Sequence, residues 1–182
     1  MDEALAISLA GLPERDDAEL ARAATEDRAA FAAIYERHRT PVYRYLRART
    51  ATDADAQDLA AITFERAMVA IHRFSPVGGG MAAWLLRIAR NAHLDALRKQ
   101  RGRGNELASD GADPATEPSD DAVVLRSLID GLPRTQRDAI QLRFAAGLTA
   151  HEIGGVLGIS KAAAQKQVER GLQALKEAYR VD

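Results

Sequence analysis

The stretch from Trp84 to Arg101 combines an apolar helical pattern with a row of cations. Its apolar positions recur at helical spacing, and they are Leu85, Ile88, Ala89, Ala92 and Ala96. A different helix face carries Arg87, Asn91, Arg98 and Arg101. Between Arg87 and Arg103 the chain holds six Arg or Lys residues and one acid, Asp95. One face therefore suits a protein core and the other suits an anion, most naturally a nucleic-acid backbone, although a solvated surface helix has the same pattern.

A second nucleic-acid signal lies in residues 147–168, where the pattern predicts a helix-turn-helix. Thr149 and Glu152 have the spacing of a capping box. Gly158 supplies a turn at which a positive φ is expected, and Ser160 is a suitable cap for the second helix. The first helix has an apolar face and a small residue for close packing, namely Ile153, Val156 and Leu157 with Gly154. An ordinary helical hairpin is the alternative.

Charge is distributed unevenly along the 182 residues, although the formal net charge is only −1. The blocks are residues 1–20 at −5, 21–104 at +7, 105–122 at −6 and 123–182 at +3. The acidic block between the two basic ones contains two prolines and few large apolar residues, so it predicts a flexible linker. We therefore expect an acidic leader over 1–15, a helical domain over 16–104, a linker over 105–122 and a helix-turn-helix domain over 123–182.

The expected fold class is all-α, because no alternating strand pattern occurs. Helix starts are predicted at Asp16 or Asp17, at Asp27, and at Asp53 or Asp55. Pro41 predicts a break or the first turn of a continuation, and Gly78-Gly79-Gly80 predicts a loop. In the second domain we expect helices over about 121–130 and 134–146, separated by Gly131-Leu-Pro133.

Composition argues against catalysis and against metal binding. The chain has no cysteine and four scattered histidines, so we expect no disulfide, metal or cofactor. The triple glycine lacks the Gly-Lys-Ser/Thr that a phosphate-binding loop requires. No apolar run approaches about 18 residues and the start of the chain is acidic, so a transmembrane segment or signal peptide is not expected. The sequence predicts a cytoplasmic, nucleoid-associated binding protein that is not an enzyme.

Taken in order along most of the chain, the motifs resemble the extracytoplasmic-function (ECF) sigma factors of bacterial RNA polymerase. Residues 27–31 resemble the opening of the family's first promoter-binding domain. Residues 56–59 with Thr63 and Phe64 resemble its polymerase-binding helix. Residues 84–98, preceded by Phe74, resemble the segment that opens the minus-ten element. Gly131-Leu-Pro133 and the helix-turn-helix resemble the domain that reads the minus-thirty-five element.

The resemblance implies site residues and partners. Contacts to core polymerase fall to Gln57, Asp58, Leu59, Ile62 and Phe64. Contacts to the minus-ten element fall to Phe74, Arg87, Ile88, Arg90, Asn91, Asp95, Arg98, Lys99 and Arg101. Contacts to the minus-thirty-five element fall to Lys161, Gln165, Lys166, Glu169 and Arg170. The implied partners are promoter DNA, the β′ clamp helices and β flap of polymerase, and an anti-sigma factor.

Elementary chemistry assigns parts to several of these residues. Phe74 and Ile88 could form the wall of a base pocket, although core packing explains them equally well. Asn91 can both donate to and accept from a base edge. Gln165 can pair with adenine, and Arg170 with guanine or phosphate. Glu169 could accept from cytosine and the lysines suit phosphates.

Some positions depart from the family pattern, and two other functions remain open. Ala61 and Ile62 replace a polar and an acidic residue of the polymerase-binding helix, and Ala164 and Gln165 are unusual in the recognition helix. Promoter preference therefore cannot be copied from a relative. The alternatives are a stand-alone helix-turn-helix regulator and a sigma mimic that sequesters an anti-sigma factor. Trp84 is expected in the core, since it lies on the apolar side of its helix.

Overall fold

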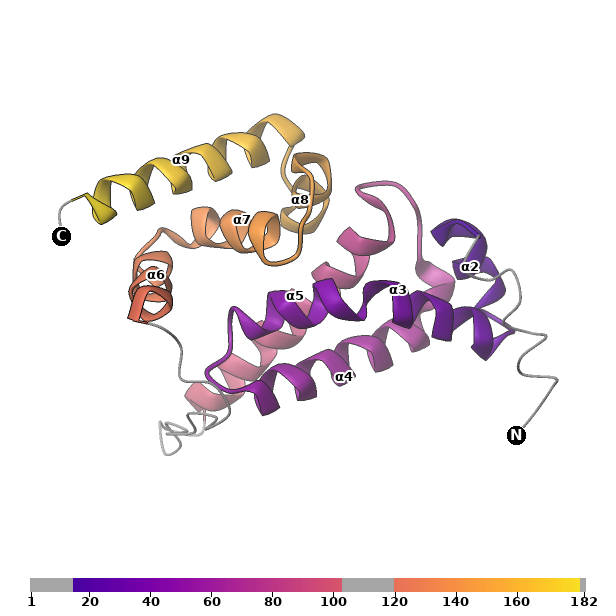
Figure 1. Cartoon of the computed structure of the whole chain (residues 1–182). Helices are drawn as coiled ribbons and strands as arrows, with labels where there is room; N and C mark the ends of the chain where they lie inside the picture. Colours follow the sequence, from indigo (N-terminus) through magenta and orange to yellow (C-terminus); the bar gives the residue numbers. More distant parts are fainter. Residues whose placement is uncertain (1–14, 103–119, 181–182) are drawn as a thin grey trace.

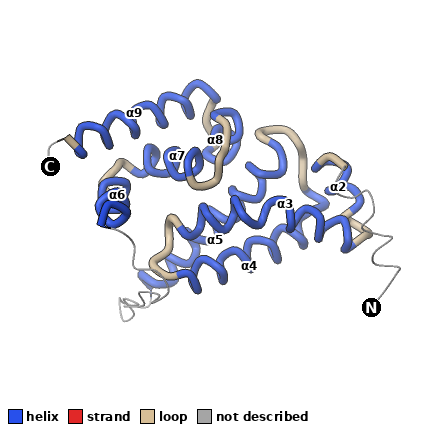
Figure 2. Tube along the Cα trace, in the orientation of Figure 1, coloured by secondary structure: helices blue, strands red, loops and turns tan. Residues whose placement is uncertain are grey.

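The computed structural model describes residues 15–102 and 120–180, and over these two ranges every regular element is a helix (Figure 2). The all-α prediction is therefore confirmed for the described residues. The predicted leader lies outside them apart from residue 15, and so does the predicted linker up to residue 119. Within the described ranges, no helix is both long enough and apolar enough to cross a membrane.

The first range forms a helical group that we call the N-terminal bundle (Figure 1). Its elements are α2 (Asp17–Ala23), α3 (Arg28–Arg47), α4 (Asp53–Ala70), the short 3-10 helix η2 (Ile71–Arg73) and α5 (Gly80–Gly102). Local capping explains the first starts, because the carboxylates of Asp16 and Asp27 accept from backbone N–H groups of the first turn. Helix α4 begins at Asp53 as predicted, and the hydroxyl of Thr52 caps it.

The prediction at Pro41, a break or the first turn of a continuation, is wrong, since α3 runs through this residue without interruption. Proline lacks an N–H group, so the helix loses one backbone hydrogen bond there. His38, Val42 and Tyr45, which lie on either side, are all buried. Packing of this helix face against the core therefore outweighs the local preference of proline.

The second range forms what we call the C-terminal unit. It consists of α6 (Asp120–Asp130), α7 (Arg134–Phe144), α8 (Ala150–Leu157) and α9 (Lys161–Tyr179). Helix α6 starts at residue 120, so the last three residues of the predicted linker belong to a helix instead. Residues 131–133 separate α6 from α7 as predicted, and Pro133 occupies the cap position of α7.

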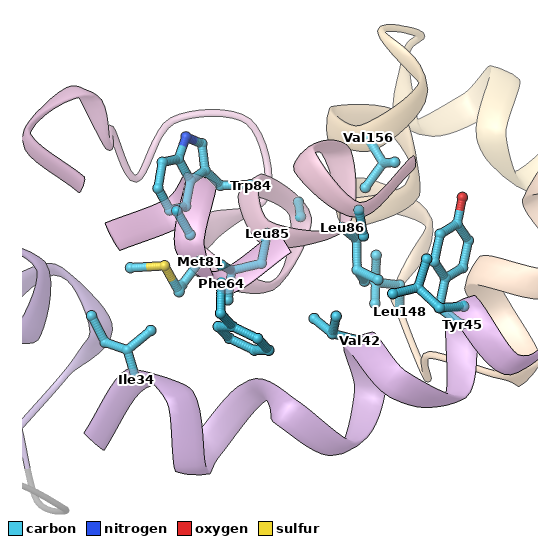
Figure 3. Packing of buried hydrophobic residues seen from close by; sticks show 14 of the residues in the cluster. Ile34, Val42, Tyr45, Phe64, Met81, Trp84, Leu85, Leu86, Leu148 and Val156 are labelled. Carbon is cyan, nitrogen blue, oxygen red and sulfur yellow. The ribbon is translucent and has the colours of Figure 1, made fainter. Parts of the chain in front are cut away.

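One hydrophobic core runs through both parts of the chain. In the N-terminal bundle, α3, α4 and α5 pack together around Ile34, Val42, Phe64 and Leu85 (Figure 3). Leu148 and Val156 of the C-terminal unit are buried in the same cluster, beside Leu86 and Tyr45. Trp84 is 9% exposed and belongs to this core, which confirms the prediction for it. The two parts are thus packed against each other in this structure.

Candidate nucleic-acid interface

Helix α5 presents two chemically different faces. Leu85, Ala89 and Ala92 are buried against the bundle, as the spacing predicts. The exposed side chains on its outer side include Arg87, Asn91, Arg98 and Lys99. Arg101 lies in the last turn of α5, and its side chain is outside the described set. The face suited to an anion therefore exists, and the bundle holds it in place.

The triple glycine, whose last residue is the first of α5, determines how the helix begins. Gly78, Gly79 and Gly80 have φ values of 87°, 106° and 72°, a left-handed region that other residues rarely adopt. A Cβ on Gly79 would lie 2.8 Å from the Cβ of Ala83 and 2.8 Å from the Cα of Glu152. The tight turn therefore has two functions, because it starts α5 and it brings the loop against α8 of the C-terminal unit.

Phe74 and Ile88 are half-buried, so each is packed on the core and also reaches the surface. The Phe74 ring meets Trp84 edge-on, with ring centroids 5.6 Å apart and planes at 71°. Phe74 also lines a small hollow with Ile71, His72 and Pro76, opposite residues of α2. A packed aromatic residue beside a hollow is compatible with both interpretations from the sequence.

Asp95 acts within the protein as the acceptor for two arginines. Its carboxylate accepts from Arg98 at 2.8 Å and from Arg66 of α4 at 3.1 Å. A carboxylate near a phosphate would repel it, and these bonds give Asp95 a different part, which is to hold two cations on the same surface. Arg66 thereby joins the cationic face, although its sequence neighbourhood carries no signal for this.

Helices α8 and α9 form the predicted helix-turn-helix, and its local devices are confirmed. Thr149 and Glu152 form a reciprocal capping box. Gly158 ends α8 in the left-handed conformation at φ 70°. The Ser160 hydroxyl accepts from the Ala163 N–H at 3.1 Å and caps α9. Gly154 is needed for the turn, since a Cβ there would lie 2.7 Å from the carbonyl oxygen of Ile159.

The outer face of α9 carries all the side chains predicted to contact the minus-thirty-five element. These are Lys161, Gln165, Lys166, Glu169 and Arg170, and each is exposed. Gln165 donates to the Glu169 carboxylate at 3.0 Å, which orients both side chains along the helix. Ala164 is fully buried on the opposite side. In Figure 1, α9 lies on the side of α7 that faces away from α5.

The predicted polymerase-binding residues of α4 divide into two sets. Gln57, Asp58 and Ile62 are exposed. Leu59 and Phe64 are 8% and 5% exposed and belong to the hydrophobic core of this structure, and their assignment to polymerase stays a prediction. The helical period places them on the inner side, where Phe64 meets Tyr35 edge-on. Exposed Met68 and Val69 extend the outer apolar surface of α4 and were not predicted.

Arg90 differs from the other cations of α5 because it points into the contact between the two parts of the chain. Its Nε and Nη2 donate to Oδ2 of Asp138 in α7 at 3.1 Å and 3.0 Å. Arg49 donates from Nη2 to the other oxygen, Oδ1, at 2.6 Å. We call this polar contact region the seam. It comprises Tyr45, Ala48, Arg49, Thr50, Arg90 and His93 on one side and Arg126, Asp138 and Gln141 on the other.

The seam alters the ionisation of two groups. The pKa of His93 is lowered to about 4, because burial and the nearby Arg49 guanidinium both lower it, while Asp138 opposes the shift. Burial raises the pKa of Tyr45 to about 12. The Tyr45 ring also supports the Arg49 guanidinium, whose central carbon lies 4.5 Å from the ring centroid. None of these seam residues except Arg90 was singled out from the sequence.

Comparison with known proteins assigns a family to each part. Residues 34–103 match the Sigma-70 region 2 family and residues 122–175 match the Sigma-70, region 4 family. The RNA polymerase sigma factor CarQ of Myxococcus xanthus is 36% identical over 155 residues, which cover 81% of this chain and 88% of CarQ. The ECF RNA polymerase sigma factor BldN of Streptomyces coelicolor is 30% identical over 164 residues. The match covers 85% of this chain but only 62% of BldN.

Solved structures have the same architecture. CnrH in complex with the cytosolic domain of CnrY matches with a TM-score of 0.71 at 25% identity, over 91% of this chain and 98% of CnrH. The sigma factor RpoE of Bartonella quintana, in complex with the anti-sigma factor NepR, matches with a TM-score of 0.61 at 25% identity. That match covers 79% of this chain and 93% of RpoE. The chain therefore belongs to the ECF sigma factors of the sigma-70 family.

Proposed function

We propose that this chain directs RNA polymerase to promoters and helps to open the DNA there. One observation carries the proposal: a single chain presents two separate exposed faces suited to DNA, one on α5 and one on α9. The α5 face combines cations with an amide and lies beside a half-buried aromatic residue. The α9 face belongs to a helix-turn-helix with complete capping. Two such faces suit the two elements of a bacterial promoter.

At the minus-ten element, we assign Asn91 to the edge of an unpaired base. Its amide is exposed and can both donate and accept. Phe74 and Ile88 supply the apolar wall that an extruded base needs. Arg87, Arg98 and Lys99 hold phosphates, and Asp95 keeps Arg98 and Arg66 in place. Arg90 can join the phosphate contacts only when it leaves Asp138.

At the minus-thirty-five element, α9 lies in the major groove with Gln165 and Arg170 reading bases. Lys161 and Lys166 contact the backbone. Glu169 orients Gln165 in the free protein and can accept from cytosine in the complex. Discrimination then depends on side chains that are already exposed, so no rearrangement of α9 itself is required.

The exposed side of α4 is the surface that we assign to core polymerase. Gln57 and Asp58 supply polar groups, and Ile62, Met68 and Val69 supply apolar area. A helix face with this much exposed apolar area on a small domain marks an interaction site. The β′ clamp helices and β flap are the expected contacts on polymerase. An anti-sigma factor is a further expected partner, because related RpoE is seen with one.

The alternatives make different demands on the molecule. A sigma mimic that only sequesters an anti-sigma factor needs neither an exposed cationic face on α5 nor a reading face on α9. A stand-alone regulator needs its own dimerisation element, and the described helices offer no heptad pattern for one. The exposed faces of α5 and α9 therefore support the sigma function over the mimic and the stand-alone regulator.

The deciding experiment is run-off transcription with core polymerase and genomic promoter fragments, with and without this chain. The proposal requires promoter-specific transcripts only when the chain is present. A regulator would bind duplex DNA without polymerase. A mimic would neither bind DNA nor direct transcription. Failure of the unmodified chain to direct any transcript would contradict the sigma function.

Asn91→Ala provides the residue-level test of strand opening. The residue is exposed, so folding and polymerase binding should remain intact. A lost hydrogen bond to a base costs about 1–3 kcal/mol, which is roughly tenfold to a hundredfold in open-complex occupancy. The defect should shrink on a template already mismatched across the minus-ten region, because unpairing no longer has to be driven. Permanganate footprinting measures strand opening on the paired and on the mismatched template. Equal opening of fully paired DNA by mutant and parent would remove Asn91 from the site.

A further inference from the structure

The carboxylate of Asp138 joins the two parts of the chain. Its two oxygens each accept from a different region of the N-terminal bundle, Oδ1 from Arg49 and Oδ2 from Arg90. These partners are 89 and 48 residues away in sequence. Asp138 is 3% exposed although it lies on a helix of the other unit. A buried carboxylate is tolerated only when it is paired, so its burial depends on these two arginines.

Other bonds of the seam are centred on the turn that follows α3. The Gln141 amide donates to the Ala48 carbonyl at 3.1 Å, and the Arg126 guanidinium donates to the Thr50 carbonyl. On the opposite side of the contact, the backbones themselves touch. A Cβ on Gly155 of α8 would lie only 1.7 Å from the Gly78 carbonyl oxygen. The C-terminal unit is therefore held at one end by polar side chains and at the other by glycine.

The seam has features of a contact that can separate. Three of its buried polar atoms have no hydrogen-bond partner among the described residues: the Tyr45 hydroxyl, Nε of Arg49 and Oε1 of Gln141. Each unpaired buried group carries a desolvation penalty, which water would remove once the seam opened. Opening would also leave Asp138 and the two arginines able to be hydrated or to bind other ions. These unpaired atoms oppose closure, whereas the two ion pairs of Asp138 and the buried apolar residues favour it.

We propose that Asp138 is the latch of a closed, autoinhibited state in which it competes with DNA phosphate for Arg90. The competition is direct because a guanidinium whose Nε and Nη2 bind one carboxylate oxygen cannot give the same two donors to a phosphate. The claim that Asp138 keeps Arg90 from DNA rests on the proposed function of α5. The latch itself rests only on the contacts of the seam. DNA that binds the open state would in turn open the chain, since the coupling is reciprocal.

The latch is tested with Asp138→Asn, which keeps the shape and removes the charge. The chain has no cysteine, so Met68→Cys on α4 and Lys176→Cys on α9, both exposed, can carry a fluorescent donor and acceptor. Asp130→Asn is the matched control, because it removes the same charge from an exposed position of α6. Transfer efficiency in the free protein should fall for Asp138→Asn and stay at the parent value for Asp130→Asn. Unchanged transfer in Asp138→Asn would overturn the latch.

Arg49→Gln is the second variant, and Arg49 is not among the residues assigned to DNA. It should open the chain as well, and combining it with Asp138→Asn should open the chain no further than the larger single effect. This variant keeps the test decisive if Asp138→Asn fails to fold, which circular dichroism would show. Independent, additive effects of the two changes would overturn the assignment of one shared latch.

The masking of DNA contacts is tested by fluorescence anisotropy with a labelled fork of random DNA sequence. If about 90% of the free chain is closed, the apparent affinity is weakened about tenfold, and Asp138→Asn should recover most of it. If Asp138→Asn binds the DNA no more tightly than Asp130→Asn does, the proposed competition with phosphate is overturned. Saturating DNA should also lower the transfer efficiency of the parent. Because the distance measurement needs no polymerase, an intact latch with no promoter-directed transcription would contradict the proposed function alone.

Discussion

His93 is a buried, neutral imidazole in the seam, and its protonation makes the stability of the fold depend on pH. Its pKa is about 4 in the folded chain, against an ordinary value of 6.5. The unfolded chain therefore binds more protons between these values, so this residue makes stability fall as pH decreases from about 6.5 towards 4. Above about pH 6.5 its contribution is constant.

The expected result is a midpoint near pH 4 for the His93 ring in NMR titration. Urea unfolding should also show lower stability at pH 5 than at pH 7, and His93→Gln should reduce that difference. A His93 midpoint near 6.5 would contradict the burial of the ring in solution. An unchanged pH dependence in His93→Gln would show that other groups cause the loss.

Gln165 and Gln173 form a matched pair on α9. Both are exposed, and each donates to a glutamate four residues later, at 3.0 Å and 2.7 Å. Only Gln165 lies in the half of the helix that is expected to enter the groove. Gln165→Ala should therefore change the preferred minus-thirty-five sequence in a promoter-variant library, by about 1–3 kcal/mol at one base pair. Gln173→Ala should leave the preference unchanged, and equal behaviour of the two would remove Gln165 from the reading set.

Backbone contacts should behave differently from base contacts. Arg98→Ala and Lys99→Ala remove exposed cations of α5, so they should weaken binding to many sequences alike. Each should also reduce the salt dependence of binding, by about one unit of slope per phosphate contact. Titrations at several salt concentrations measure this. A change that depends on the promoter sequence would instead indicate that the residue reads bases.

At the scale of elements, two neighbouring glycines of α8 serve different contacts. One allows packing inside the helix-turn-helix and the other allows packing between the two parts of the chain. Gly154 faces the turn inside the helix-turn-helix, and Gly155 faces the Gly78 carbonyl of the N-terminal bundle. Gly154→Ala should lower the thermal stability of the chain, because its Cβ would collide with backbone that has to stay in place. Gly155→Ala should keep α8 folded, since alanine favours a helix by up to about 1 kcal/mol, but should separate the two units.

Circular dichroism melting and the donor–acceptor distance of the labelled chain distinguish these outcomes. Gly155→Ala should give a nearly normal helix signal with lower transfer efficiency. A closed Gly155→Ala chain would mean that the contact with residue 78 does not form in solution. Equal melting of Gly154→Ala and the parent would mean that the turn can adjust to a side chain.

The elements that could be predicted are those whose signals are local. Asp16, Asp27, Thr149 and Ser160 cap helices as expected, because a cap acts within one turn. Pro41 misled the prediction because the force that keeps α3 continuous is burial against other helices. A pattern within one helix carries no record of such distant partners.

In the candidate site too, only the features with a local signal could be predicted. The exposed faces of α5 and α9 follow from helical period and charge. Leu59 and Phe64 were assigned to a contact surface by resemblance, while burial puts them in the core. Asp138 could not be found, because an acid in a charged helix normally lies in solvent. Only the approach of Arg49 and Arg90 from the other part of the chain makes it special.

At the scale of the whole molecule, the connection between α5 and α6 supplies proximity. A short tether holds two units at an effective concentration in the millimolar range. Such a concentration closes a weak interface that free fragments at micromolar concentration would not form. The seam combines buried ion pairs with unpaired polar atoms, so we expect it to be weak in this sense.

Cutting the chain tests this directly. Residues 105–119 belong to the predicted linker and lie outside the described residues, so a protease site can be placed there without changing a described contact. After cleavage, the two fragments should elute together in gel filtration at about 100 μM and separately at about 1 μM, because the tether no longer raises their local concentration. Asp138→Asn should separate the fragments at both concentrations. Fragments of the parent that stay together at the lower concentration would show a tight interface, and the covalent connection would then not be what keeps the chain closed.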